Sequence, residues 1–182
     1  MVYTRNVLIE QLRGYTTTHG EERPFVPAFL NLLSHPDCFL RTHLPGHITG
    51  SAWIVDKQRS HVLLVQHAKL KKWLQPGGHA DGDENVLQVA MRETEEETGL
   101  SNIRLIHTGI FDIDVHPIPA RKDFTEHLHF DIRFLLEANR EDKITISEES
   151  TDVRWIPLAD LDAFNEERSV IRMKEKVNEF VT

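Results

Sequence analysis

The most informative part of the 182-residue chain is the stretch Gly78-His79-Ala80-Asp81-Gly82-Asp83-Glu84, continued after seven residues by Arg92-Glu93-Thr94-Glu95-Glu96-Glu97-Thr98-Gly99-Leu100. The pattern predicts a helix from Glu84 to Thr98, because Asp83 can cap its start and Gly99 can end it in the left-handed conformation. Three glutamates at positions i, i+3 and i+4 share one face of this helix. They adjoin the apolar positions of the helix, so they border the core: Glu93, Glu96 and Glu97.

Three neighbouring carboxylates repel one another and destabilise a helix unless cations neutralise them. Hard divalent ions that prefer oxygen ligands, such as Mg²⁺ or Mn²⁺, would do so. A solvated acidic helix face would account for the glutamates alone. It does not account for the glycine pair Gly77-Gly78 before the helix, Arg92 directly before the cluster, and Gly99 directly after it.

This segment resembles the Nudix box, in which Gly, five residues, Glu, seven residues and Arg-Glu precede an aliphatic residue, any residue, Glu-Glu, any residue, Gly and an aliphatic residue. Eight positions match in register: Gly78, Glu84, Arg92, Glu93, Glu96, Glu97, Gly99 and Leu100. Thr94 stands where an aliphatic residue is usual, and the loop Asp81-Gly82-Asp83-Glu84 departs from the commoner order of its acidic residues. Both departures leave the ligand positions intact.

The resemblance implies an α/β fold, a Nudix-type α/β/α sandwich with a mixed sheet. It implies that a metal ion, Mg²⁺ or Mn²⁺, is held by Glu93, Glu96 and Glu97, and that Arg92 orients one of these carboxylates. Water would attack one phosphorus of a diphosphate linkage. Glu93 and Glu97 are then catalytic residues with Arg92, and Glu93 is the first candidate for the general base. The alternative bases lie outside the box: Glu126, Glu148 and Glu149.

Further elements are expected around the box. Residues 6–15, 27–33, 158–164 and 168–180 have helical spacing, and residues 47–55, 61–67, 103–115, 127–137 and 153–156 are strand-like. We expect the first two strands to form an antiparallel hairpin, and residues 116–126 to form a polar loop. Residues 1–43 form a short N-terminal helical extension packed on the domain, and residues 44–182 form the Nudix hydrolase domain.

A second polar pattern follows the box in the strand at 127–137. Alternate residues of a strand share a face, so His127, His129, Asp131 and Arg133 lie on one side, with Leu128, Phe130, Ile132 and Phe134 on the core side. This face is either an ordinary polar surface or the wall of the substrate site. The expected substrate-binding residues are Gly77, Gly78, His79, His127, His129 and Arg133.

Composition narrows the classes of partner. The net charge of −8 does not favour general nucleic-acid binding, which requires cationic surface. The single cysteine, Cys38, allows no intramolecular disulfide, and we expect a small half-buried side chain. No apolar run has the length of a membrane span. We therefore expect a cytoplasmic protein with a small nucleotide-type substrate, and a homodimer by resemblance alone.

Two other functions remain open from the sequence. A Nudix domain can act as a nucleotide-sensing binding module, but such modules commonly lose carboxylates that this box retains. Prenyl diphosphate isomerases share the fold and need a catalytic cysteine, whereas Cys38 lies before the sheet. The hydrolase prediction does not identify the substrate, because specificity in this family depends on loops outside the box.

Overall fold

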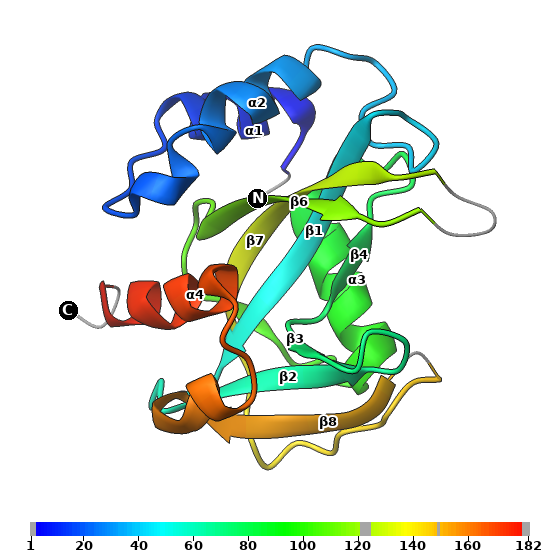
Figure 1. Ribbon diagram of the computed structural model, residues 1–182. Helices are drawn as coiled ribbons and strands as arrows, with labels where there is room; N and C mark the ends of the chain where they lie inside the picture. Colours follow the sequence, from blue (N-terminus) through cyan, green and yellow to red (C-terminus); the bar gives the residue numbers. More distant parts are fainter. Residues whose placement is uncertain (1–2, 121–124, 149, 180–182) are drawn as a thin grey trace.

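A computed structural model of the chain describes residues 3–120, 125–148 and 150–179. Figure 1 shows a twisted sheet with helices packed against it. The elements follow the order α1 (Arg5–Arg13), η1 (Gly20–Glu22), α2 (Phe25–Leu32), β1 (Gly46–Val55), β2 (His61–His67), β3 (Trp73–Leu74), β4 (Gly77–His79), α3 (Val86–Thr98), β5 (Arg104–Leu105), β6 (Asp112–Ile118), β7 (His127–Glu137), β8 (Ser150–Pro157), η2 (Leu158–Ala163) and α4 (Arg168–Glu179).

The strands form one eight-stranded mixed sheet. Its centre is a parallel pair, β1 and β7, which stay in register over ten residue pairs. The other pairings are antiparallel: β1 with β2 and with β4, β2 with β3 and with β8, and β7 with β5 and with β6. The predicted mixed sheet and the predicted hairpin of β1 and β2 are confirmed.

Side-chain alternation along the strands produces two separate cores. On one face, even-numbered residues of β1 and β7 such as Ile54 and Phe134 pack with α1, α2 and α3. On the other face, odd-numbered residues such as Trp53 and Leu135 pack with η2 and α4. Helices therefore cover both faces, which confirms the α/β/α sandwich.

The N-terminal helices are part of the first core. Helices α1 and α2 lie side by side (Figure 1) and close to their predicted positions. The ring of Phe29 meets Phe130 edge-on at 5.2 Å between centroids, and Tyr3 meets Phe134 at 5.0 Å. Leu8 is fully buried in the same cluster. The division of the chain at residues 43 and 44 stays a prediction, because one continuous core spans both parts.

Three expected elements differ in the structure. The strand predicted at 103–115 is divided into β5 and β6 because residues 107–110 leave the ladder, where the Ile110 N–H donates to the side chain of Gln11. Strand β6 continues to Ile118, into the expected loop, with Pro117 at an exposed position. The helix predicted at 158–164 is the 3-10 helix η2. Part of the expected loop, residues 121–124, lies outside the described residues.

Within the described residues, each helix is too short or too polar to span a bilayer.

A buried ionic network joins the sheet to α4 and η1. Asp112 of β6 accepts hydrogen bonds from Arg133 at 3.0 Å and from Arg172 Nε at 2.8 Å, and it lies 2.9 Å from Lys176 Nζ. Lys176 also donates to Glu22 at 2.6 Å. Burial alone would raise the pKa of Asp112, but the three cations around it hold that pKa well below its ordinary value.

The Asp112→Asn variant tests this network. The amide keeps the shape of the carboxylate but leaves three buried cations short of one negative charge. We expect the free energy of unfolding to fall by about 3–5 kcal/mol, measured by urea denaturation at neutral pH. Asp160→Asn, at an exposed position of η2, is the matched control and should change little.

Lowering the pH should also reduce the free energy of unfolding, because it protonates Asp112. Because the pKa of Asp112 is lower in the folded than in the unfolded state, its contribution is present above the unfolded value near 4 and is lost as pH falls below it. Wild-type stability should therefore decline more steeply below about pH 4 than that of the variant. Equal slopes would show that Asp112 does not dominate the acid response.

Candidate functional site

In the structure, the predicted box brings β4 and α3 into close contact with β1. Strand β4 pairs with β1 so that Gly77 lies opposite Ser51 and Gly78 opposite Gly50. A Cβ atom on Gly77 would lie 2.3 Å from the Cβ of Ser51, and one on Gly50 would lie 2.7 Å from Val86 of α3. Only glycine fits at positions 77 and 50. Gly77 therefore allows β4 to lie close to β1, and Gly50 allows α3 to lie close to β1.

Two of the three predicted metal-ligand glutamates lie against this glycine pair. The Gly77 N–H donates to Glu97 Oε1 at 2.9 Å. The Glu93 carboxylate lies 2.5–2.7 Å from the place that a Cβ on Gly78 would occupy. The side chain of Glu93 is 16% exposed, whereas that of Glu96 is 57% exposed. The structure thus places Glu93 and Glu97 at the border of the core, as predicted, and Glu96 toward solvent.

Arg92 holds the cluster together from the solvent side. Its Nη1 lies 2.9 Å from Glu93 Oε1 and 3.1 Å from Glu96 Oε2, and its Nη2 donates to the His79 carbonyl at 3.2 Å. The guanidinium therefore ties the carboxylates of α3 to β4. The pairing predicted for Arg92 is present, and its orienting role stays a prediction.

Contacts at both ends of α3 and at Thr94 within it show how the box residues are accommodated. Gly99 has φ 74° and ends the helix in the left-handed conformation, as predicted. Asp83 does not cap α3; its carboxylate accepts from the Asn85 N–H at 2.8 Å, and the helix begins at Val86. Thr94 is buried, and its hydroxyl donates to the Ala90 carbonyl at 2.8 Å, so it replaces an aliphatic residue without an unsatisfied polar atom.

Glu84, the first glutamate of the box, is held by the N-terminal extension. Arg5 Nε donates to Glu84 Oε1 at 3.0 Å, and its other nitrogens donate to the carbonyls of Leu33, His35 and Pro36. Arg5 therefore connects the loop before α3 with the segment that follows α2. Glu84 has a cationic partner of its own, apart from Glu93, Glu96 and Glu97.

A row of polar residues crosses the opposite face of the sheet beside β4. In register, His47 of β1 lies beside His129 of β7, and His129 beside His116 of β6. The ring centroids of His47 lie 5.0 Å from those of both His127 and His129, and that of His79 lies 4.9 Å from His129. The structure thus gathers the predicted residues His79, His127 and His129 and adds His47 and His116.

The environment keeps several of these rings uncharged. Burial, followed by the charges of neighbouring groups, lowers the pKa of His129 to about 2 and that of His79 to about 4. Burial also lowers the pKa of His47. Neutral imidazole is the form that accepts hydrogen bonds and binds metal ions.

Arg133 shares this face but points into the buried ionic network. It is 2% exposed, and its nitrogens lie 2.8–3.3 Å from Asp131, Asp112 and Asp114. Three aspartates neutralise the charge of Arg133. Arg133 is therefore not placed to bind a phosphate. The sequence did not reveal this, because Asp112 and Asp114 come from another strand.

The other candidates are exposed, fully buried or outside the described residues. Glu126 and Glu148 are exposed, and Glu149 lies outside the described residues. Cys38 is fully buried and not half-buried as expected; burial raises the pKa of its thiol to about 11. A thiol in this state is a poor nucleophile.

The chemistry of the donor set fits a hard divalent cation. Glu93, Glu96 and Glu97 offer only carboxylate oxygens, which Mg²⁺ and Mn²⁺ prefer. The absence of a Cβ at Gly78 leaves space at the Glu93 carboxylate.

Comparison with known proteins agrees with this geometry. A family model described as NUDIX domain matches residues 47–177, which is more than half of the chain. The chain belongs to the Nudix family. The prediction of a Nudix-type pyrophosphohydrolase is also supported by the names of similar proteins.

Two curated relatives illustrate the range of the family. A probable DHNTP pyrophosphohydrolase of Lactococcus lactis subsp. cremoris is 28% identical over 138 residues, covering 74% of this chain and 80% of the relative. The asymmetrical bis(5'-nucleosyl)-tetraphosphatase of Rattus norvegicus is 34% identical over 106 residues, covering 57% of this chain and 69% of the relative.

Solved structures show the same fold. The Ap4A hydrolase of C. elegans, described as a binary complex, has a TM-score of 0.61 at 22% identity over 74% of this chain and 96% of that one. The NUDIX domain of Shewanella oneidensis NrtR, in complex with ADP ribose, has a TM-score of 0.55 at 21% identity over 74% and 88%.

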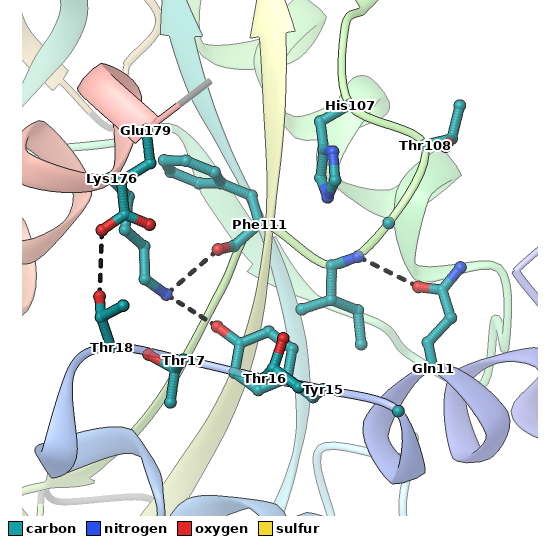
Figure 2. A pocket seen from close by; sticks show the side chains of 13 residues that line it. Gln11, Tyr15, Thr16, Thr17, Thr18, His107, Thr108, Phe111, Lys176 and Glu179 are labelled. Atoms are coloured by element: carbon teal, nitrogen blue, oxygen red, sulfur yellow. Dashed lines mark hydrogen bonds between the residues drawn. The ribbon is translucent and has the colours of Figure 1, made fainter. Parts of the chain in front are cut away.

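A separate cavity of about 740 Å³ lies beside α4 in this Nudix chain (Figure 2). Residues 14–18 and 107–111 line it with Gln11, Lys176 and Glu179, and it includes none of the predicted site residues. Lys176 donates there to the Tyr15 hydroxyl at 2.7 Å and to the Phe111 carbonyl at 3.2 Å. The cavity is therefore distinct from the box.

Sequence reasoning missed His47 as a member of the histidine row. The available signal was the alternation His47-Ile48-Thr49-Gly50-Ser51, in which polar residues occupy every second position of a predicted strand. Its partners could not be identified, because the parallel pairing of β1 with β7 joins residues 82 positions apart.

Arg5→Ala should loosen the connection between the extension and the Nudix box. The variant loses the ion pair with Glu84 and three hydrogen bonds to carbonyls, so we expect stability to fall by roughly 1–2 kcal/mol. Hydrogen exchange should increase at residues 33–40 and 84–86. Arg13→Ala, which removes only an exposed pair with Glu10, is the control. Unchanged exchange in both segments would exclude this role of Arg5.

Proposed function

We propose that the protein hydrolyses a diphosphate linkage in a small nucleotide-type substrate with the help of a divalent metal ion. The proposal is carried by the placement of Glu93 and Glu97 against Gly78 and Gly77, with Arg92 bridging Glu93 to Glu96. This arrangement confines three carboxylates to one edge of the sheet, where a cation would relieve their repulsion. Membership of the Nudix family supports the reaction class.

Glu93, Glu96 and Glu97 are the residues that would hold Mg²⁺ or Mn²⁺. When bound, the ion neutralises phosphate charge and makes a coordinated water more acidic. Gly77 fixes the Glu97 carboxylate by one backbone hydrogen bond, and Arg92 fixes the Glu93 carboxylate by an ion pair. The protein thereby orients the two carboxylates before substrate arrives, which reduces the cost of organising the site.

Glu93 is the proposed general base. It would accept a proton from the attacking water while the water oxygen forms a bond to phosphorus. The bond from that phosphorus to the bridging oxygen breaks, and the leaving phosphate group keeps the electron pair. Two phosphorylated products result. Among the alternative bases, Glu126 and Glu148 are exposed and distant in sequence from the cluster.

The substrate would lie over β4 and the adjoining histidines. Gly78 presents no side chain on the α3 side of β4, and His79, His127 and His129 offer imidazole groups on the other face of the sheet, where a distal part of the substrate would lie. The names of the relatives point to pterin and dinucleotide polyphosphates, and the NrtR domain was crystallised with ADP ribose. We infer a nucleotide-type substrate from these proteins. A cytoplasmic location, a homodimer and the lack of nucleic-acid binding stay predictions.

Replacing Glu97 with Gln tests the metal assignment. The amide oxygen can still accept the Gly77 N–H, but the charge is lost. With Mg²⁺ or Mn²⁺ and a panel of dinucleoside tetraphosphate, dihydroneopterin triphosphate and ADP ribose, we expect kcat/KM to fall at least about 100-fold. Glu95→Gln is the matched control, since Glu95 is exposed on the same helix outside the cluster.

The outcome separates hydrolysis from sensing. If wild type hydrolyses a member of the panel and Glu97→Gln hydrolyses it at the same rate, the metal assignment is refuted. No turnover of any panel member, together with a rise in melting temperature on nucleotide addition, would favour the binding module.

Gly78→Ala should impair catalysis without unfolding the protein. The new Cβ would overlap the end of the Glu93 side chain, which is flexible enough to move away at small cost in stability. Because Glu93 is displaced, kcat should fall by about 10-fold or more, while the melting temperature changes little. Gly20→Ala is the control, since a Cβ there meets nothing within 4 Å. An active Gly78→Ala enzyme would show that the position of Glu93 is not critical.

A further inference from the structure

We propose that His47, His127 and His129 form a second metal site, which binds a borderline divalent cation of the Zn²⁺ type. The site is separate from the carboxylates of α3, and it lies on the opposite face of the sheet. It does not depend on the proposed hydrolysis. The inference rests on the positions, tautomers and burial of the three imidazoles.

The spacing of the ring nitrogens suits a single ion. One ring nitrogen from each of the three histidines lies within 4.8 Å of the other two. The Nε2 atoms of His127 and His129 are 3.3 Å apart. Two nitrogens bound at about 2.0–2.1 Å to a tetrahedral Zn²⁺ lie roughly 3.3–3.4 Å apart, so this pair already has the required separation.

Hydrogen bonds of the Nδ1 atoms set the tautomers of His127 and His47. His127 Nδ1 lies 2.8 Å from the Thr125 carbonyl, and His47 Nδ1 lies 3.4 Å from the His43 carbonyl. A carbonyl oxygen only accepts, so the Nδ1 atoms of His127 and His47 carry the proton and their Nε2 atoms carry a lone pair. His129 Nε2–H then donates to His127 Nε2, and binding of an ion would move that proton to His129 Nδ1. Metal-bound histidines are commonly oriented in this way by a second partner on the other ring nitrogen.

A second, independent observation is the buried Nε2 atom of His47. Its side chain is 1% exposed, and within the described residues its Nε2 has no hydrogen-bond partner. A buried polar atom without a partner costs free energy. A cation bound between the three rings would satisfy it, and the paired strands β1 and β7 would hold the ligands without rearrangement of the backbone.

The donor set selects against Mg²⁺. Asp131, the nearest carboxylate on the same strand, is taken up by hydrogen bonds from Thr49, Ser51 and Arg133. The remaining donors are imidazoles, which favour Zn²⁺, Co²⁺, Ni²⁺ or Cu²⁺ over Mg²⁺ and Mn²⁺. The two sites of the molecule should therefore take different ions.

The competing interpretation is a cluster of stacked imidazoles that contacts substrate and binds no ion. The His47 and His127 rings are stacked at 5.0 Å with an interplanar angle of 27°, which such a cluster would also show. Direct measurement of metal binding distinguishes the two.

The test uses the untagged full-length protein, stripped with a chelator and kept in excess Mg²⁺ to saturate carboxylates. Calorimetric titration with Zn²⁺ should show one equivalent bound, and Co²⁺ should give the intense visible absorption of a tetrahedral ion. His129→Gln should weaken Zn²⁺ binding by more than about 100-fold, beyond the 10–100-fold typical of losing a second-shell partner. His61→Gln, a histidine that hydrogen bonds to Ser60 at the start of β2, should bind like wild type.

Three results would overturn the inference: no Zn²⁺ binding by wild type, unchanged affinity in His129→Gln, or equal loss in Glu97→Gln, which would assign the ion to α3. Long-range proton–nitrogen spectra of histidine side chains in the unaltered protein provide a test that does not depend on a variant folding. Zn²⁺ should shift the Nε2 signals of three histidines. A shift of none, or of Nδ1 signals instead, would contradict the site.

Discussion

The site depends on the close approach of β1, β4 and α3 at three glycines. Gly50 lies under Val86, Gly77 lies against Ser51, and Gly78 leaves space for the Glu93 carboxylate. A side chain at Gly50 or Gly77 would push α3 or β4 outward, and one at Gly78 would displace the Glu93 carboxylate. The same steric constraint thus determines both the packing of the sheet and the arrangement of the acidic cluster.

The sheet then divides the charged groups into separate environments. The glutamates of α3 border one core, where Arg92 and the Gly77 N–H are their cationic and polar partners. The aspartates of β6 and β7 lie on the other face, where Arg133, Arg172 and Lys176 neutralise them. Histidines of β1, β6 and β7 occupy another part of that face. Because the aspartates of β6 and β7 have cationic partners of their own, they can be buried without a bound ion.

Local patterns predicted the box, α3 and β7, because capping residues, glycine and strict alternation act over a few residues. What the sequence left open came from pairings between distant segments. His47 meets His129 only through the parallel register of β1 and β7, and the aspartates that bind Arg133 lie in β6. The polar face of β7 was predicted correctly, but whether Arg133 faces ligand or network depended on β6. The interruption at residues 107–110 likewise coincides with a contact to Gln11 of α1.

The N-terminal helices show how a segment outside the family match contributes to the site. The match begins at residue 47, yet Phe29 and Leu8 complete the core beneath β7. Arg5 supplies a positive charge to Glu84, the glutamate at the entrance to α3. If Glu84 had no such partner, its charge would add to the repulsion among the glutamates of α3. Neutralising it from α1 leaves the three inner carboxylates as the group that a divalent ion would satisfy.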